Sequence, residues 1–225
     1  MTDVVSKESV ETDEAETETD DATELAARYG SSRGRFEVFE APPIRRPPTP
    51  EQVADLDLSR AADGFDYSDL VTTHEEQDVR DAIAEMARAI APGSAVTPLF
   101  AQRTPDGMSL VHAWFGPNFP LFRHSHPKYG DCLYYIVAGS IVMGSRVLKA
   151  GDGFFVPNGA PYKYQAGPDG VEVLEFRAGG GVPDAPGMKL HEKSVDGINR
   201  ITEAAKAQQP AWVEPPATIA NAYGS

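Results

Sequence analysis

Cysteine and long apolar runs are nearly missing from this chain. It has one cysteine in 225 residues, which excludes an intrachain disulfide and favours a reducing compartment. No apolar run approaches the roughly 18 residues that a membrane-spanning helix needs, and the N-terminus lacks the basic and apolar regions of a signal peptide. These absences predict a soluble, cytoplasmic protein without a membrane partner.

Basic residues are also scarce, with 20 Lys and Arg against 34 Asp and Glu and a formal net charge of −14. Because nucleic-acid binding needs clustered basic residues to neutralise phosphates, this charge argues against a nucleic-acid partner. The chain up to Glu24 contains ten acidic residues and one lysine, and its large apolar residues stop at Val10. Such a segment cannot bury enough surface to offset its ordering entropy, so we expect residues 1–23 to be a disordered acidic tail.

The sequence patterns of residues 24–94 indicate an N-terminal extension that precedes the main domain. Glu24–Tyr29 predicts a helical turn that stops at Gly30. The alternating segment Phe36–Phe39 predicts a strand added to the main sheet. Residues 41–50 are rich in proline and predict an extended, semi-rigid connector.

Two helices are expected after this connector. Thr49 is the predicted N-cap of a short helix and Pro50 its first residue. A longer helix is expected from Thr73, because Thr73 and Glu76 have the spacing of a capping box. Its apolar residues recur at helical spacing, at Val79, Ile83, Met86, Ala87 and Ile90. We expect this stripe to cover a sheet face, or to meet the partner subunit of a homodimer, with Phe36–Phe39 as the other candidate interface.

From residue 95 onward, short strands and turn signals alternate at close spacing, which indicates an all-β barrel. Turns are expected at Pro105–Gly107, Gly139–Ser140 and Pro168–Gly170. The eight strands of an antiparallel jelly roll over residues 95–178 are then Ala95–Gln102, Met108–Phe115, Leu121–His126, Cys132–Ala138, Ile141–Leu148, Phe154–Pro157, Tyr162–Gln165 and Val171–Arg177. The C-terminal extension over residues 179–225 carries a short helix at Asp196–Ala207, whose inward residues are Ile198, Ile201 and Ala205.

Two histidines stand two residues apart in the predicted strand Leu121–His126. Alternate residues of a strand point to the same face, so His124 and His126 converge. Neutral imidazole binds zinc, copper, iron and nickel, and the pair is therefore half of a metal site. An isolated pair of this kind is also compatible with two inert, hydrogen-bonded side chains at a strand end.

The stretch around this pair resembles the cupin superfamily, the RmlC-like jelly-roll barrels. The first cupin motif, G-x5-H-x-H-x3,4-E-x6-G, is matched by His124, His126 and Gly139. The second motif, G-x5-P-x-G-x2-H-x3-N, is matched by Gly151, Pro157 and Gly159. The resemblance covers residues from about 95 to 178. It implies a cupin-type antiparallel β-barrel with short flanking helices and a metal site.

The chain departs from the family at the other ligand positions. The family's glutamate falls on Asp131 when counted from His126 and on Cys132 when counted from Gly139, while Tyr162 replaces its second-motif histidine. We expect a divalent metal such as Fe2+ or Zn2+, held by the two histidines with a third donor from Asp131, Cys132 or Tyr162. Carboxylate beside two histidines resembles the facial triad of non-haem iron, whereas thiolate favours zinc or copper. Asp131 is the preferred donor because the family uses an acid there, and Tyr162 is the expected catalytic acid or base.

Side chains on the histidines' face would wall a ligand pocket at the barrel mouth. An inward Cys132 would turn Tyr134 and Ile136 inward as well, whereas an inward Asp131 would select Leu133, Tyr135 and Val137. The predicted pocket consists of Trp114, Phe122, Tyr134, Ile136 and Tyr164. Ordinary core packing is the competing interpretation for each of them.

The sequence thus predicts a metal-dependent enzyme of dioxygenase, isomerase or lyase type that acts on a small organic molecule in the barrel. The alternative is a non-catalytic cupin that has lost its metal and binds a small molecule as a sensor. The presence of both histidines favours the enzyme. Fold alone does not choose the reaction, because one fold hosts many chemistries.

Overall fold

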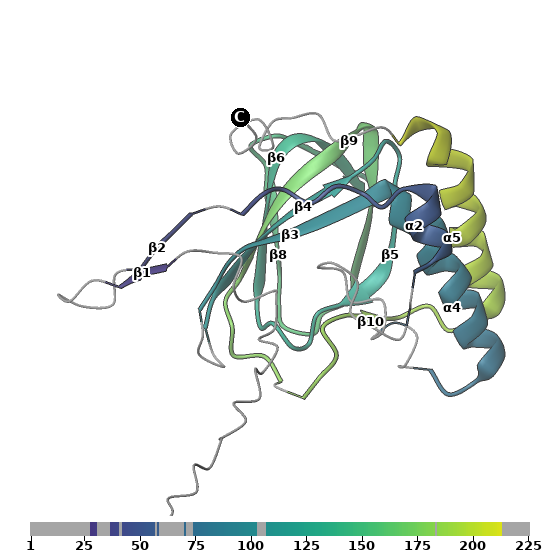
Figure 1. The fold of residues 1–225 in the computed structure, drawn as a ribbon, viewed down its shortest axis with the longest axis horizontal. Helices are drawn as coiled ribbons and strands as arrows, with labels where there is room; N and C mark the ends of the chain where they lie inside the picture. Colours follow the sequence, from purple (N-terminus) through teal and green to yellow (C-terminus); the bar gives the residue numbers. More distant parts are fainter. Residues whose placement is uncertain are drawn as a thin grey trace, which may run out of the picture.

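The structure is a computed structural model that describes residues 28–30, 37–40, 42–56, 58, 70, 74–102, 107–182 and 184–212 (Figure 1). The predicted acidic tail over residues 1–23 lies outside the described residues. Within the described part, no helix has both the length and the apolar character needed to cross a membrane.

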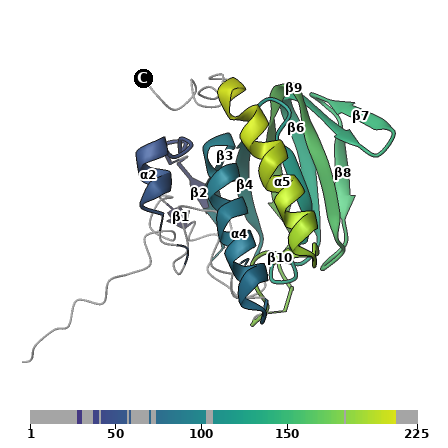
Figure 2. The same ribbon diagram turned by 90° about the vertical axis from the view of Figure 1, so that its right-hand side faces the viewer.

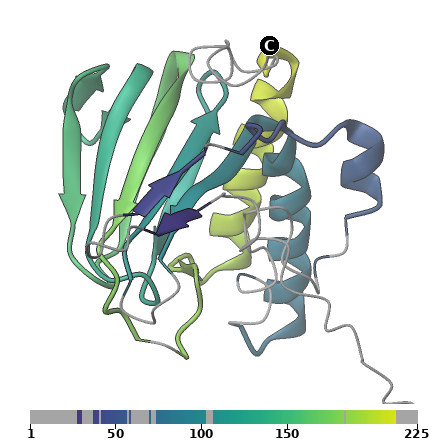
Figure 3. The ribbon, with the colours of Figure 1, turned by 60° about the vertical axis from the view of Figure 1, so that its left-hand side comes forward.

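The described chain is built around one curved sheet of eight strands, which curls into a half-barrel (Figures 1 and 3). Neighbours in the sheet run in the order β10, β5, β9, β4, β3, and β6 pairs with β7, β8 and β9. The strands are β3 Ser94–Ala101, β4 Ser109–Phe115, β5 Pro120–Ser125, β6 Cys132–Met143, β7 Arg146–Lys149, β8 Gly153–Val156, β9 Tyr162–Arg177 and β10 Lys189–Leu190. All of these pairings are antiparallel, which confirms the predicted all-β jelly roll.

Two of the predicted turns are wrong, because β6 and β9 run straight through them. Gly139 lies inside β6, opposite Val171 and beside a register shift, with φ at 73°. A Cβ atom on Gly139 would lie 2.1 Å from the carbonyl oxygen of Gly170 in β9. The glycines therefore permit a bulge and a close approach of two backbones instead of a turn. The actual hairpin joins Met143 to Arg146 through Gly144, whose φ is 61°.

The third predicted turn, Pro105–Gly107, falls between β3 and β4 in the sequence. Residues 103–106 lie outside the described residues, but Ala101 pairs with Ser109 in the antiparallel register that a hairpin requires. From the C-terminal extension, β10 joins the main sheet beside β5.

Strand alternation fixes which side chains enter the barrel. On β6, Cys132, Tyr134 and Ile136 are buried, whereas Leu133 and Tyr135 are nearly half exposed. Tyr134 is paired with Glu175 and Ile136 with Val173 on β9, and directly opposed residues of an antiparallel pair share a face. Of the two predicted alternatives for β6, the structure therefore has the one in which Cys132, Tyr134 and Ile136 point into the barrel.

Helices α4 (Gln77–Ile90) and α5 (Val195–Gln208) lie side by side against the sheet (Figures 1 and 2). The apolar stripe of α4 is buried in the same core as Val96 and Phe115 of the sheet. A role of this stripe in a subunit interface is therefore not supported, because its own chain covers it. The helix begins at Gln77, later than predicted, and the N-cap residue Glu76 makes no side-chain cap. Thr73 lies outside the described residues.

The predicted C-terminal helix is confirmed as α5, with Ile198 and Ala205 buried and Ile201 half-buried. Two short 3-10 helices, η1 (Ala91–Gly93) and η2 (Gln209–Ala211), follow α4 and α5. After η2, Trp212 donates its indole Nε1–H to the carbonyl oxygen of Pro117 at 2.9 Å. Its ring lies against Gly93 and Gly116, where an added Cβ would come within 2.5 Å of ring atoms. Trp212 thereby ties the end of α5 to the start of the barrel.

The N-terminal extension is partly as predicted. Helix α2 (Pro50–Ala54) begins at Pro50, with Thr49 as N-cap and Gln52 completing a capping box. The strand expected at Phe36–Phe39 is present as β2 (Glu37–Phe39), but it pairs with β1 (Arg28–Gly30) in a separate two-stranded sheet. Arg28 and Tyr29 are therefore extended, so the predicted helical turn is wrong at these two residues, and its residues 24–27 lie outside the described residues. The connector after β2 crosses β3, where the Arg45 backbone N–H bonds to the Thr97 hydroxyl at 2.9 Å.

Replacing Ile83 with alanine should reduce the free energy of unfolding by about 2–5 kcal/mol, because this fully buried side chain fills the space between α4 and the core. Lys206→Ala is the control: it removes the ion pair with Glu85 on the same helix pair, at exposed positions. Urea unfolding of both variants checks this. Equal midpoints for the two variants would contradict the packing of α4 described above.

Candidate functional site

The two histidines meet inside the barrel, at the end of β5. The His124 Nδ1 lies 2.9 Å from the carbonyl oxygen of Phe122, and the His126 Nδ1 lies 2.7 Å from that of Gly187. A carbonyl oxygen can only accept, so both Nδ1 atoms carry the hydrogen and both Nε2 atoms present a lone pair. These two Nε2 atoms are 3.1 Å apart. The pair is thus oriented as ligating imidazoles are, each held through its second ring nitrogen.

Two tyrosines extend the pair across the barrel. The Tyr162 hydroxyl lies 3.0 Å from the His124 Nε2 and donates to the Tyr134 hydroxyl at 2.8 Å. The Tyr134 hydroxyl donates in turn to the Glu175 Oε1 at 2.9 Å. Strand register brings these groups together, because Tyr162 is paired with His124 and Tyr134 with Glu175.

A largely buried ion pair between Glu175 and Arg177 ends this chain of contacts. The Arg177 guanidinium bonds to both carboxylate oxygens of Glu175, at 2.9 and 3.3 Å, and lies 3.9 Å from the Tyr129 ring centroid. Sequence reasoning missed the pair. The sequence nevertheless contains a signal for it. Glu175 and Arg177 are two positions apart in a strand expected to be buried, so their side chains must share a face.

Burial sets the protonation states of the cluster. Loss of hydration, helped by the nearby His126, lowers the pKa of His124 to about 3, and burial also lowers the pKa of His126. Burial and the Glu175 charge raise the pKa values of Tyr134 and Tyr162 well above their ordinary value. Both imidazoles are therefore neutral at pH 7, and both phenols keep their protons.

Glu175 stays ionised despite its position. Burial alone would raise its pKa, but Arg177, His126 and the hydrogen bonds from Arg177 and Tyr134 lower it to about 2. The interior thus holds one negative and one positive side chain beside two neutral imidazoles.

Counting hydrogens exposes a deficit in this cluster. The contacts His126–His124, His124–Tyr162, Tyr162–Tyr134 and Tyr134–Glu175 make four links. With both Nδ1 hydrogens used on carbonyls, only the two phenolic hydrogens remain for them. The contact between the Nε2 atoms has no hydrogen at all. Two bonds of about 2.1 Å to one metal ion would place two nitrogens about 3.0–3.4 Å apart, so the observed separation fits a cation between them.

The three predicted alternatives for a third metal ligand, Asp131, Cys132 and Tyr162, lie in different places. Cys132 points inward, but burial raises the pKa of its thiol to about 12, so it is protonated. Asp131 is exposed, and its Oδ1 accepts the backbone N–H of Asn158 at 2.8 Å. Gly130, whose φ is 73°, shortly precedes β6, the strand whose alternation turns Cys132 inward. Across the described residues, no three His, Cys, Asp or Glu side chains group as a metal site would require. Tyr162 supplies an oxygen on the Nε2 side of the pair, 3.0 Å from the His124 Nε2.

Most predicted pocket residues accompany the histidines. Phe122, Tyr134, Ile136 and Tyr164 are buried on the inward face. Phe154, which sequence reasoning did not select, stacks on Tyr134 with ring centroids 4.5 Å apart. Trp114 is elsewhere, because its β9 partner Glu172 alternates with the inward Val173. Trp114 therefore lies on the outer face of the sheet, together with His112, whose Nε2 is 3.4 Å from Glu172.

Without bound metal, the free energy of unfolding should fall as pH is lowered from about 6.5 to 5. The unfolded chain binds a proton at the ordinary histidine pKa of 6.5, whereas folded His124 binds one only near pH 3. Each such group contributes a slope of up to about 1.4 kcal/mol per pH unit. His124→Asn should flatten this dependence, measured by urea unfolding in chelator across that range. An unchanged slope in the variant would contradict a neutral His124.

Replacing Glu175 with glutamine should destabilise the fold by about 3–5 kcal/mol, because Arg177 would remain buried without its counter-charge. The double variant Glu175→Gln, Arg177→Met should recover part of this loss. Glu203→Gln, on the exposed side of α5, is the matched control. Chemical unfolding of the three variants measures these changes in the free energy of unfolding. A double variant less stable than Glu175→Gln would contradict the ion pair between Glu175 and Arg177.

Comparisons with known proteins identify structures of the same kind. No protein-family model and no curated protein sequence matches the chain. One similar solved structure is an RmlC-like cupin from Shewanella frigidimarina, with 26% identity over 40% of this chain and 79% of that chain and a TM-score of 0.33. Another is the polyketide cyclase RemF from Streptomyces resistomycificus, with 20% identity over 52% of this chain and 84% of that chain and a TM-score of 0.37. A third is KdgF from Halomonas, with 26% identity over 39% of this chain and 80% of that chain and a TM-score of 0.32. The antiparallel half-barrel, the histidine pair at the end of β5 and the glycine- and proline-containing motif after β7 agree with the resemblance to the cupin superfamily.

Proposed function

We propose that this protein is a metal-dependent cupin enzyme of dioxygenase, isomerase or lyase type that acts on a small organic molecule inside the barrel. The observation that carries the proposal is the contact between the Nε2 atoms of His124 and His126. Two lone pairs face each other at 3.1 Å without a hydrogen between them. A buried arrangement of this kind is unfavourable unless a cation occupies it, and the lowered pKa of His124 argues against a proton.

Three side chains offer the donors for such an ion. His124 and His126 supply two nitrogens, and the Tyr162 oxygen is the third donor. Cys132 is the alternative third donor, because its side chain also points into the barrel. Fe2+ and Zn2+ both accept imidazole with an oxygen donor. When bound, a divalent ion of this type polarises a carbonyl group or acidifies a water molecule.

Tyr162 is the proposed proton-transfer residue. Its hydroxyl stands between His124 and Tyr134, so a substrate beside the histidines would meet it. Because burial holds its pKa well above the ordinary value, Tyr162 enters the reaction with its proton in place. Tyr134, held by Glu175, fixes the position of that hydroxyl, and Arg177 keeps Glu175 ionised.

Charge balance suggests the class of substrate. Glu175 and Arg177 cancel, and both imidazoles are neutral, so a divalent ion would leave the interior with two uncompensated positive charges. Ionisation of Tyr162 would cancel only one of them. We therefore expect a substrate with an anionic group, such as a small organic acid, whose apolar part packs against Phe122, Phe154 and Tyr164.

Metal binding tests the proposal directly. Chelator-treated protein is offered Fe2+, Zn2+, Mn2+, Ni2+ and Cu2+ in turn, desalted and analysed for bound metal. Wild-type protein should retain about one equivalent of at least one ion. His124→Ala, His126→Ala should retain none, because both nitrogen donors are gone. His191→Ala removes a histidine that faces Ser125 instead of the pair and should behave like wild type.

The same experiment separates the enzyme from its alternative. Circular dichroism must show that each variant is folded. If folded wild-type protein retains none of the five ions, the metal-dependent enzyme is rejected and a small-molecule-binding cupin without metal takes its place. A homodimer in the cytoplasm remains a prediction for either function.

A further inference from the structure

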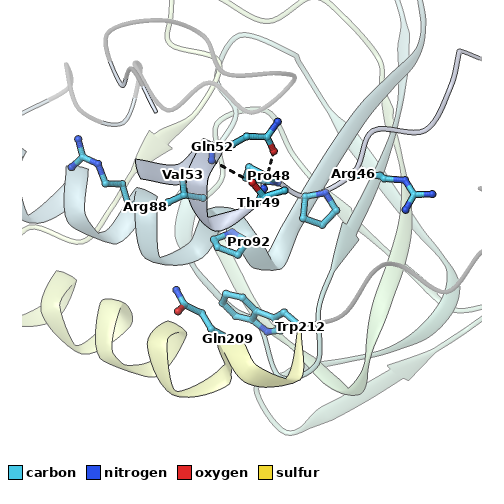
Figure 4. Close-up of a pocket in the computed structure, with 10 residues that line it drawn as sticks. Arg46, Pro48, Thr49, Gln52, Val53, Arg88, Pro92, Gln209 and Trp212 are labelled. Carbon is cyan, nitrogen blue, oxygen red and sulfur yellow. Dashed lines mark hydrogen bonds between the residues drawn. The ribbon is translucent and has the colours of Figure 1, made fainter. Parts of the chain in front are cut away.

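A second cavity lies outside the barrel, where the proline-rich connector, α2, the end of α4 and the end of α5 meet (Figure 4). Its volume is about 670 Å³, within the range of roughly 300–1,000 Å³ that is typical of small-molecule sites. Apolar surface comes from Pro48, Val53, Pro92 and Trp212. None of its lining residues belongs to the histidine cluster, so it is a separate site.

The aromatic wall of this cavity is fixed in place. The Trp212 indole is anchored by its bond to Pro117, and its ring rests on the backbones of Gly93 and Gly116. The neighbouring Gln209 side chain donates to the carbonyl oxygen of Ala89 at 2.9 Å. In Figure 4 the indole ring lies beside Pro92 at one wall of the cavity. A flat ligand would therefore meet a preorganised surface.

Charge at the rim selects the sign of the ligand. Arg88 and Arg46 lie at opposite ends of the cavity, with their side chains directed outward to the rim (Figure 4). Among the described residues that line it, none is acidic. In a chain with a formal net charge of −14, the Arg88 guanidinium at the rim favours an anionic ligand.

The polar side chains of the wall point to the same conclusion. The Thr49 hydroxyl oxygen accepts the Gln52 backbone N–H, and the Gln52 Oε1 accepts the Thr49 backbone N–H. The Thr49 side chain also bonds to the Glu51 carboxylate, whereas the capping box leaves the Gln52 Nε2 hydrogens to offer. An amide donor in the same wall as Arg88 suits a ligand with acceptor oxygens.

We propose that this cavity binds a small organic anion with a flat apolar body, such as an aromatic carboxylate. The apolar body packs between Trp212 and the side chains of Val53 and Pro92. The carboxylate lies at the rim, where Arg88 pairs with it. This site needs neither the metal nor the reaction proposed for the barrel.

The test uses the full-length protein and 1-naphthoate as the probe. The chain has two tryptophans, so its proton–nitrogen NMR spectrum shows two indole N–H signals, assigned with Trp212→Phe. Titration should move the Trp212 signal and leave that of Trp114, buried in the sheet, in place. From typical ligand efficiency, the expected Kd is on the order of 1 mM or tighter.

Matched variants and a neutral probe locate the contacts. Arg88→Ala should weaken binding about fivefold, the upper range for an exposed ion pair, whereas Arg146→Ala, an exposed arginine on β7, should not. The neutral 1-naphthalenemethanol should bind several-fold more weakly. Val53→Trp should abolish binding by filling the cavity, and Arg88→Trp, which fills it from α4, replaces the first variant if that one does not fold.

Three results would overturn the proposal. One is the absence of any Trp212 shift up to about 10 mM probe, tenfold above the expected Kd. Another is unchanged binding in the filled variants, which would place the ligand elsewhere. The third is equal affinity for the acid and the alcohol. Loss of metal binding in the histidine variants has no effect on this titration, so the two proposals fail independently.

Discussion

The pairing of β9 with three other strands holds this molecule together. β9 is hydrogen-bonded to β5, β4 and β6, and its inward face carries Tyr162, Tyr164, Glu175 and Arg177. Its two ends therefore supply the phenol at the histidine pair and the ion pair at the far end of the hydrogen-bond chain. A slip of one residue would turn all four side chains outward. Register along β9 is thus both the main constraint on the fold and the condition for the site.

Local spacing was enough to predict part of this arrangement. The convergence of His124 and His126 follows from strand periodicity alone, and Tyr162 was located by its place in the second motif. Tyr134 was selected through the inward alternative that begins at Cys132, which is the one that the structure adopts. Each of these inferences depends on residues a few positions apart.

The remainder depends on contacts that local patterns do not contain. Glu175 meets Tyr134 across 41 positions of sequence, and the register that pairs them is set by bulges whose glycines resemble turn signals. Trp114 alternates correctly with its neighbours, yet only the order of the strands shows that its face is the outer one. The choice between Asp131 and Cys132 likewise depends on backbone geometry that no residue count supplies.

Trp212 makes three distant positions interdependent in the history of the chain. Its ring occupies the space where a side chain at residue 93 or residue 116 would begin. A lineage that replaced Trp212 with a small residue would release both glycines to vary, and any larger residue fixed at either position would then block the return of the tryptophan. A residue larger than glycine at either position therefore requires a change at Trp212 as well, although 96 positions separate Gly116 from that ring.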